Sequence, residues 1–208
     1  MVMGHPSTPQ FRTFHALRIK GFATTDTLAE MTAVETADVE SHLLSFSKGG
    51  HVQFREKRGL WQLTPDGREV HLDYLAADLD GLDPVSALAD HYSVFIDLNG
   101  RFKELCGDWQ LRDGAPNDHS DADYDADVID RLHGVHSEAE PVVSDMGGVI
   151  QRLSPYSSRL TVVLGRLKQG ETNMFTGVMC GSYHDAWMEL HEDLILTQGI
   201  DRAAEGSF

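Results

Sequence analysis

The feature that most constrains the fold is a regular apolar spacing in the second half of the 208-residue chain. Residues recur there by alternating steps of four and three, the spacing that keeps one stripe of a long helix apolar. Two series show it: Leu88, Tyr92, Phe95, Asn99, Phe102, Cys106 and Trp109, and then Val128, Leu132, Val135, Ala139, Val142, Met146, Val149 and Leu153. The sequence therefore predicts two long helices that pack in a helical bundle.

Two shorter helices complete the predicted bundle. The third is expected over about 157–168, and the fourth runs from near Phe175, or from after Gly181, to Thr197. Pro141 predicts a kink in the second long helix. The segment GLDP at 81–84 combines Gly and Pro, which marks a joint followed by a helix start. We expect an all-helical domain over 84–208.

The first eighty residues carry short-range signals of helix starts and stops. The segment FRTFHALRIKG at 11–21 predicts a helix that Gly21 ends. Thr27 and Glu30 have capping-box spacing, which predicts a short helix through Met31. A further helix is expected from Thr36 to the cation and two glycines at 48–50. Its buried residues would be Val39, Leu43, Leu44 and Phe46.

A predicted β-hairpin follows these helices. The segments HVQF at 51–54 and LWQL at 60–63 have the composition of strands, and the KRG segment at 57–59 supplies a turn between them. Thr64 and Pro65 then suit the N-cap and first position of another helix. The predicted order is helix, helix, turn, helix, hairpin, helix.

This order resembles the winged helix-turn-helix domain of bacterial transcription regulators, broadly of the MarR type. The likeness covers roughly residues 10–78 and rests on Leu28-Ala29, Val34, Val39, His42-Leu43, Gly50-His51-Val52 and Leu63-Thr64-Pro65-Asp66-Gly67-Arg68. It implies a mainly α fold with a small β-hairpin wing: a winged helix-turn-helix domain over 1–80, followed by an antiparallel helical bundle. It also implies a homodimer with double-stranded DNA as its partner.

Charge is distributed unevenly along the chain, whose formal net charge is −16. Residues 1–80 hold 8 Lys and Arg against 11 Asp and Glu, whereas residues 81–208 hold 9 against 22. Three of the scarce cations, Arg55, Lys57 and Arg58, fall at the tip of the predicted wing. We expect them to contact DNA phosphates, which contributes affinity rather than sequence reading. The alternative is a hairpin tip that is charged only for solubility.

The helix expected to enter the major groove is acidic. Residues 36–47 contain no Lys or Arg and include Asp38 and Glu40. The side chains that could reach bases or phosphates there are Thr36, Ser41, His42 and Ser45, with Lys48 at the helix end. Either DNA binding is weak and depends on dimerisation, or this module has lost DNA binding and serves as a dimerisation or docking unit.

Polar residues interrupt the apolar stripes of the bundle. Asn99 lies in the first stripe, with Arg101 two residues later and Trp109 further along the same helix. These residues predict either a notch for a small molecule carrying a carboxylate or phosphate, or a register-setting Asn as in coiled coils. Tyr183, His184 and Trp187 would provide an aromatic and imidazole lining for a core or pocket.

Motifs for catalysis are missing from the sequence. It has no Gly-x-Ser-x-Gly, no Walker or dinucleotide loop and no cysteine pair with zinc spacing, since Cys106 and Cys180 are its two cysteines. We therefore expect no enzyme activity, no cofactor and no bound metal. No run of 18 apolar residues occurs, so we expect no membrane span and a cytoplasmic protein.

The leading hypothesis is a one-component transcription regulator. Its helical domain would dimerise, sense a small-molecule effector, or both. The alternative is an adaptor that docks on a metabolic enzyme without binding DNA. Residues 98–110 and the segment SYHDAWMELHEDLI at 182–195 are also loosely similar to helical segments of proteins related to pyruvate,phosphate dikinase. That similarity implies an association with metabolism and no catalytic residue.

Overall fold

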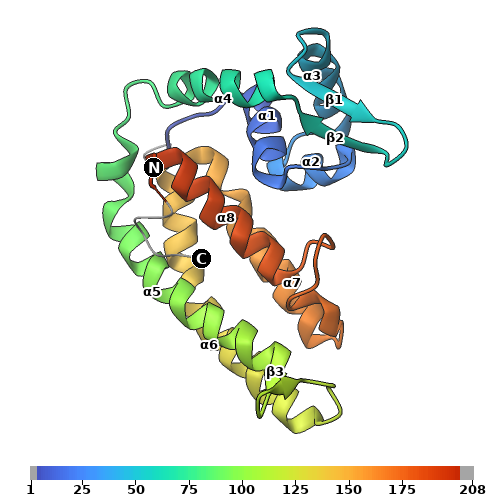
Figure 1. Ribbon diagram of the computed structural model, residues 1–208. Helices are drawn as coiled ribbons and strands as arrows, with labels where there is room; N and C mark the ends of the chain where they lie inside the picture. The colour runs from blue at the N-terminus through green and yellow to red at the C-terminus, as the bar shows by residue number, and fades with distance from the viewer. Residues whose placement is uncertain (1–3, 202–208) are drawn as a thin grey trace. The chain divides into compact units, whose positions relative to one another are not determined.

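The computed structural model describes residues 4–201, and the chain is mainly helical with a small antiparallel hairpin (Figure 1). The described residues divide into two compact units. Unit 1 comprises residues up to 87 together with 147–155 and the segment from 191, and unit 2 comprises 88–146 and 156–190. Unit 1 thus contains most of the predicted 1–80 domain and two later segments of the chain.

Unit 1 begins with three helices: α1 (Pro9–Lys20), α2 (Thr25–Thr32) and α3 (Thr36–Lys48). Helix α1 ends at Gly21, whose φ of 77° suits glycine. The short second helix was correctly predicted, but its cap was not Thr27. Thr24 is the N-cap, and its hydroxyl accepts a hydrogen bond from the Thr27 backbone N–H at 3.1 Å. Thr27 therefore lies inside α2, and the N-cap is three residues before the predicted one.

The predicted hairpin and the helix after it are confirmed. Strands β1 (Val52–Arg55) and β2 (Leu60–Leu63) pair antiparallel, with Val52 opposite Leu63 and Arg55 opposite Leu60. Helix α4 (Pro65–Asp78) follows, and the Thr64 hydroxyl caps it by accepting from the Gly67 N–H at 3.0 Å. Ala23 adds a third extended segment, because it and Trp61 exchange two backbone hydrogen bonds of 2.8 and 3.1 Å.

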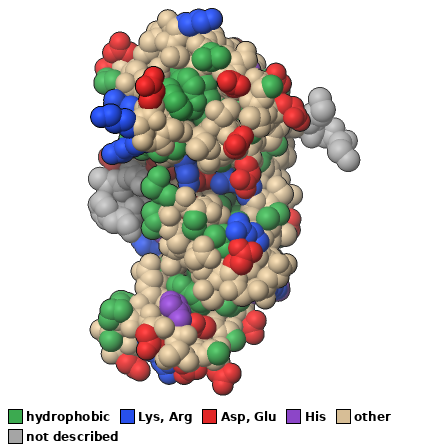
Figure 2. Space-filling model, turned by 90° about the vertical axis from the view of Figure 1, so that its right-hand side faces the viewer, with side chains coloured by type: hydrophobic (Ala, Val, Ile, Leu, Met, Phe, Trp, Pro, Cys, Tyr) green, Lys and Arg blue, Asp and Glu red, His purple; other side chains and the backbone are tan. Residues whose placement is uncertain are grey.

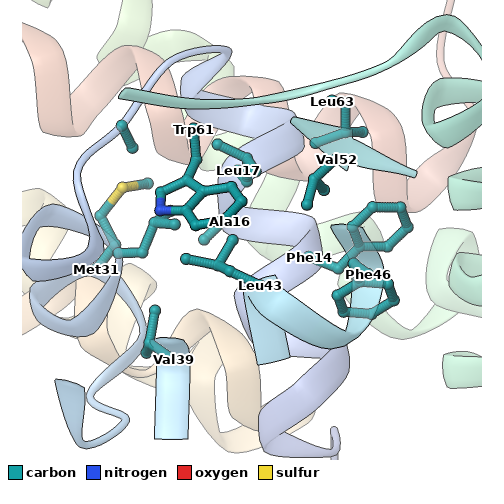
Figure 3. Packing of buried hydrophobic residues seen from close by; sticks show 12 residues of the cluster. Phe14, Ala16, Leu17, Met31, Val39, Leu43, Phe46, Val52, Trp61 and Leu63 are labelled. Atoms are coloured by element: carbon teal, nitrogen blue, oxygen red, sulfur yellow. The ribbon is translucent and has the colours of Figure 1, made fainter. Parts of the chain in front are cut away.

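An apolar core joins these elements of unit 1 (Figure 3). It draws on α1, α2, α3 and both strands: Phe14, Ala16, Leu17, Ala23, Leu28, Met31, Val39, Leu43, Phe46, Val52, Trp61 and Leu63. The Phe14 and Phe46 rings stack at its edge with centroids 4.3 Å apart. The prediction that Leu44 is buried was wrong, since 49% of its surface is exposed. Leu43 already fills the inward position on that turn, and the next residue points 100° away.

The second half of the chain forms long helices, as predicted. They are α5 (Pro84–Gln110), α6 (Ala122–Val149), α7 (Pro155–Lys168) and α8 (Tyr183–Gln198). Short elements lie between them: β3 (Leu111–Arg112), β4 (Ala115–Pro116), η1 (Gln151–Leu153) and η2 (Thr172–Met174). Helix α5 begins beside the predicted joint, where the Asp83 carboxylate caps the N–H groups of Val85 and Ser86. The fourth helix starts after Gly181, the later of its two predicted starts.

The apolar stripe of α6 drifts from its predicted path. Val128, Leu132, Val135 and Ala139 are buried as predicted, but Val143 and Ile150 are buried in place of Val142 and Val149. Within α6 the buried positions Ala139, Val143 and Met146 are spaced by four and three residues, and Ile150 follows just after the helix ends at Val149. Seven residues of a straight helix turn about 20° short of two full turns, so a second step of four, from Ala139 to Val143, helps to restore the inward direction.

Candidate nucleic-acid interface

The hairpin tip of unit 1 exposes its cations. Arg55, Lys57 and Arg58 are all exposed, and the turn is closed by bonds from the Arg58 and Gly59 N–H groups to the Arg55 carbonyl, both 2.9 Å. Gly59 has a φ of 64°, which a side chain would disfavour. The side chains of Arg55, Lys57 and Arg58 are therefore exposed to solvent around a short, hydrogen-bonded turn.

A hollow of about 560 Å³ lies against the hairpin. Its walls combine charged, amide and aromatic side chains: Phe22, Phe54, Arg55, Glu56, Lys57, Arg58 and Gln62. Figure 2 looks onto the side of the molecule at the right of Figure 1, and shows hydrophobic side chains near Lys, Arg and acidic side chains on its upper part. The hollow gives the hairpin tip a concave, positively charged surface with apolar rings in its wall.

Two aromatic rings of the hollow are open to solvent. Phe22 is 39% exposed and Phe54 is 46% exposed. Phe54 faces Trp61 across the strand pair, with ring centroids 5.0 Å apart and a tilt of 51°. Trp61 is itself 8% exposed and belongs to the core of unit 1. The ring of Phe54 therefore rests on a buried support while it faces the hollow.

Gln62 connects the wall of the hollow to one of the cations. With its amide oxygen turned toward Arg55, Gln62 accepts hydrogen bonds from Arg55 at 2.9 Å and from the Gln53 amide at 2.6 Å. These bonds orient the Arg55 guanidinium along the strand pair while leaving further N–H donors for a ligand. Sequence reasoning identified the three cations but missed Phe22, Phe54 and Gln62.

The predicted base-reading residues of α3 differ in their surroundings. Thr36, Ser41, Ser45 and Lys48 are exposed, as contact with a ligand requires. His42 is half-buried, and its Nδ1 lies 3.0 Å from the Thr13 hydroxyl.

Because the Thr13 hydroxyl donates to the Pro9 carbonyl, it must accept from His42 Nδ1–H. His42 thus joins α3 to α1, which its sequence position did not predict. Glu35, Asp38 and Glu40 are exposed near the start of α3.

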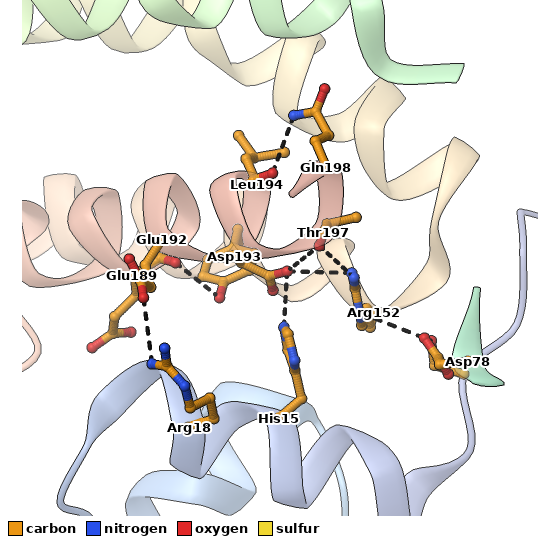
Figure 4. A network of polar contacts seen from close by, with 12 residues as sticks. His15, Arg18, Asp78, Arg152, Glu189, Glu192, Asp193, Leu194, Thr197 and Gln198 are labelled. Atoms are coloured by element: carbon orange, nitrogen blue, oxygen red, sulfur yellow. Dashed lines mark hydrogen bonds and ion pairs between the residues drawn. The ribbon is translucent and has the colours of Figure 1, made fainter. Parts of the chain in front are cut away.

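A buried polar network lies elsewhere in unit 1 (Figure 4). Its centre is the Asp193 carboxylate on α8, which accepts from His15 Nε2 of α1 at 3.0 Å. His15 Nδ1 lies 2.9 Å from Nε2 of His71 on α4. An ionised carboxylate can only accept, so His15 donates to Asp193 from Nε2, and one of the two facing nitrogens, His15 Nδ1 or His71 Nε2, donates to the other. The three side chains form a continuous chain of hydrogen bonds.

Arg152 supplies the positive charge of this network. Its guanidinium lies 3.3 Å from Asp193 and 3.7 Å from Asp78, and the side chains are 2–4% exposed. Asp78 also accepts from the Ser7 hydroxyl at 2.9 Å. These contacts hold the segments 147–155 and 191–198 against α1 and α4 within unit 1. Arg18 and Glu192 add a weaker pair at 3.4 Å at the rim.

Burial and nearby charges shift the pKa values of three groups in the network. Burial, then the nearby His15 and Arg18, lowers the pKa of His71 to about 3. Burial raises the pKa of Asp78 above its ordinary value. Burial alone would also raise the pKa of Asp193, but Arg152 and His15 bring that pKa well below its usual range. At neutral pH His71 is therefore neutral and Asp193 is ionised.

The structure brings together only part of the small-molecule site predicted in unit 2. Asn99 is 4% exposed, and its Oδ1 accepts from the indole N–H of Trp187 at 2.9 Å. Tyr183 is fully buried beside Trp187, with its hydroxyl 3.2 Å from His136 Nδ1. The polar Asn in the apolar stripe is thus paired inside unit 2 by a tryptophan.

Arg101 and Trp109 lie apart from that pair, whereas the His184 ring lies 6.2 Å from the ring of Phe102, which also contacts Trp187. Arg101 is two residues after Asn99 on α5, which places it on the opposite side of the helix, where it makes two bonds of 2.6 and 2.8 Å to Glu138. Trp109 packs on Phe175 and His119, with ring centroids 4.7 and 4.5 Å away. The predicted notch around Asn99, Arg101 and Trp109 is therefore not formed.

Other site classes find no support in the described chain. Among residues 4–201, no cluster of three or more His, Cys, Asp or Glu is arranged to hold a metal ion. No helix in this part of the chain is both long and apolar enough to cross a membrane. Comparisons with family models, curated proteins and solved structures found no match.

Proposed function

We propose that this protein is a DNA-binding transcription regulator whose nucleic-acid contact is the hairpin end of unit 1. The observation that carries the proposal is the exposed set of Arg55, Lys57 and Arg58 around a hollow in a chain of net charge −16. Positive side chains are scarce in this molecule, and three of them meet on one turn. Each phosphate that they neutralise releases a condensed counterion, which drives association.

The arrangement of elements supports the same proposal. Three short helices, a hairpin and a fourth helix follow one another, and their core joins α1, α2, α3 and both strands. This is the order that a winged helix-turn-helix domain requires, with α3 in the reading position and the hairpin as its wing. A homodimer would present two such ends to two half-sites of an operator. The remaining helices would dimerise the chain or bind an effector.

The test is a binding titration over a range of salt concentrations. Fluorescence anisotropy would compare a labelled duplex from the DNA flanking the protein's own gene with a duplex of random sequence. A regulator binds the first more tightly, and both affinities fall as salt rises. Equal affinity for both would leave a non-specific DNA-binding protein, and no binding to either at low salt would contradict the proposal.

A second candidate function is an adaptor that docks on a metabolic enzyme. The observation in its favour is the surface of α3, where Glu35, Asp38 and Glu40 are exposed together with Leu44 at 49%. Carboxylates at this position repel phosphates, whereas an exposed leucine beside them suits a protein surface. If α3 docks on a protein, Leu44→Lys abolishes its capture while leaving any DNA binding intact. If α3 faces DNA, the added cation tightens DNA binding instead.

A further inference from the structure

The hollow beside the hairpin has a composition that phosphate contact alone does not require. Cations suffice to neutralise phosphates, yet the wall also holds two open aromatic rings and an amide. We propose that this hollow receives an unpaired nucleotide of DNA, with its base against Phe54 and Phe22 and its phosphates on Arg55, Lys57 and Arg58. This inference rests on the proposed nucleic-acid binding and specifies which state of DNA is bound.

The size of the hollow suits a compact ligand. Its volume of about 560 Å³ falls within the range of about 300–1,000 Å³ typical of small-molecule sites. A phosphate alone would leave most of that space unfilled. A nucleotide brings a flat ring system and an anion together, which matches a wall with rings on one part and cations on another.

The aromatic rings favour a base that is not stacked between its neighbours in a duplex. In a duplex the faces of the bases are covered by their neighbours, so only base edges and the backbone meet a protein. An unpaired base can instead stack on an aromatic side chain, which contributes about 1–3 kcal/mol per base. Phe54 is prepared for this contact because Trp61, which is 8% exposed, supports its ring from the core side at 5.0 Å. Little further ordering is needed on binding.

The charge pattern of unit 1 points in the same direction. The hollow carries three cations and one carboxylate, Glu56. Helix α3, which would lie along the major groove of a duplex, instead exposes two carboxylates, with Glu35 at its N-cap as a third, and a single cation, Lys48. A duplex docked on α3 meets repulsion that a strand following the hairpin avoids. Unpaired DNA can therefore contact the cations of the hollow without approaching the carboxylates at α3.

The experiment compares three labelled probes of one sequence with the full-length protein. The probes are a perfect duplex, the same duplex with one unpaired thymidine in its centre, and the single strand, each measured by anisotropy at one low salt concentration. We expect the bulged duplex and the single strand to bind about tenfold more tightly than the perfect duplex, as one stacked base would give.

Two variants and a control assign the effect to the hollow. Phe54→Leu and Phe22→Leu remove rings but keep apolar bulk, so we expect each to reduce the preference for unpaired DNA over the perfect duplex about fivefold or more. Tyr74→Leu removes a ring of similar exposure, 38%, that does not line the hollow, and it should change neither affinity. Circular dichroism would verify that all three variants remain folded.

The outcomes separate this inference from the proposed function. If the perfect duplex binds as tightly as the bulged probe, and Phe54→Leu changes nothing, the hollow does not take a base although DNA binding stands. If none of the probes binds at low salt, both the inference and the proposed function are wrong. If the preference exists but survives both Phe variants, the unpaired nucleotide binds elsewhere and the inference is again overturned.

Discussion

At the scale of single residues, Gly67 occupies a position that no other residue fits. A Cβ placed on it would lie 1.9 Å from the His51 carbonyl oxygen, which also accepts from the Thr64 N–H at 3.0 Å. The first turn of α4 therefore packs directly against the backbone of His51, just before β1. The turn between β2 and α4 depends on this close approach.

Gly67→Ala should destabilise unit 1 by about 1–3 kcal/mol, the usual cost of forcing atoms into a filled site. Gly100→Ala is the matched control, because Gly100 lies inside α5 with no atom within 4 Å of the added Cβ. It should stabilise the protein by roughly 0.5–1 kcal/mol, as alanine does in a helix. Urea unfolding of both variants measures the difference. Equal changes in unfolding free energy for the two variants would contradict the close approach of Gly67 to the His51 carbonyl.

His71 gives the buried network a defined pH dependence. Its pKa is about 3 in the folded protein and 6.5 when unfolded, so the unfolded chain binds more protons between these values. The contribution of His71 to the free energy of unfolding is therefore complete above pH 6.5. It falls as the pH drops toward 3, by up to about 1.4 kcal/mol per pH unit. Asp78, with its raised pKa, opposes this trend only near the acidic end.

His71→Gln should flatten that dependence. Its amide can still form a hydrogen bond with His15, but it takes up no proton on unfolding. Unfolding free energies at pH 5 and pH 7 would differ by less in the variant than in the native protein. An equally steep slope in both would show that other groups cause the acid sensitivity.

At the scale of helices, the register of α6 is tested by two adjacent valines. Val143 is fully buried and Val142 is only half-buried. Val143→Ala should cost about 2 kcal/mol, whereas Val142→Ala should cost less than about 1 kcal/mol. Denaturant midpoints at constant slope would measure both. If Val142→Ala cost more stability than Val143→Ala, the buried stripe of α6 would follow the strict seven-residue spacing predicted from the sequence.

The Asn99–Trp187 hydrogen bond joins α5 to α8 inside unit 2. Asn99→Leu leaves the indole N–H of Trp187 buried without an acceptor, which should cost about 1–3 kcal/mol. Trp187→Phe removes that donor, so the double variant should be more stable than the two separate losses predict. A double-mutant cycle gives the coupling free energy directly. A coupling near zero would mean that the bond contributes nothing to stability.

Sequence patterns predicted most of these elements but little of how they meet. Caps, glycines and apolar spacing act within a few residues, so the bounds of α3 and β2 and the start of α4 were correctly predicted, while β1 lies one residue later than predicted. The hollow needs Phe22 and Phe54, which come together only through the bridge between Ala23 and Trp61. His15 and Asp193 are 178 positions apart. No local pattern reports contacts of that kind.

At the scale of the whole molecule, charge decides where DNA can bind. Residues 81–208 carry a balance of −13, against −3 for residues 1–80. Most of the surface therefore repels nucleic acid, and any attraction must come from a small region. If the hairpin is that region, removing its three cations weakens the salt dependence of binding, and removing three cations elsewhere does not.

The measurement that tests this account most directly is the salt dependence of DNA affinity for two triple variants. One replaces Arg55, Lys57 and Arg58 by alanine. The other replaces Arg101, Arg131 and Arg166, which are 43–48% exposed in surface ion pairs and give the same change in net charge. We predict that the first variant reduces the magnitude of the negative slope of log affinity against log salt by up to about 3, while the second variant leaves the slope unchanged. Equal slopes in both variants would contradict a nucleic-acid interface at the hairpin.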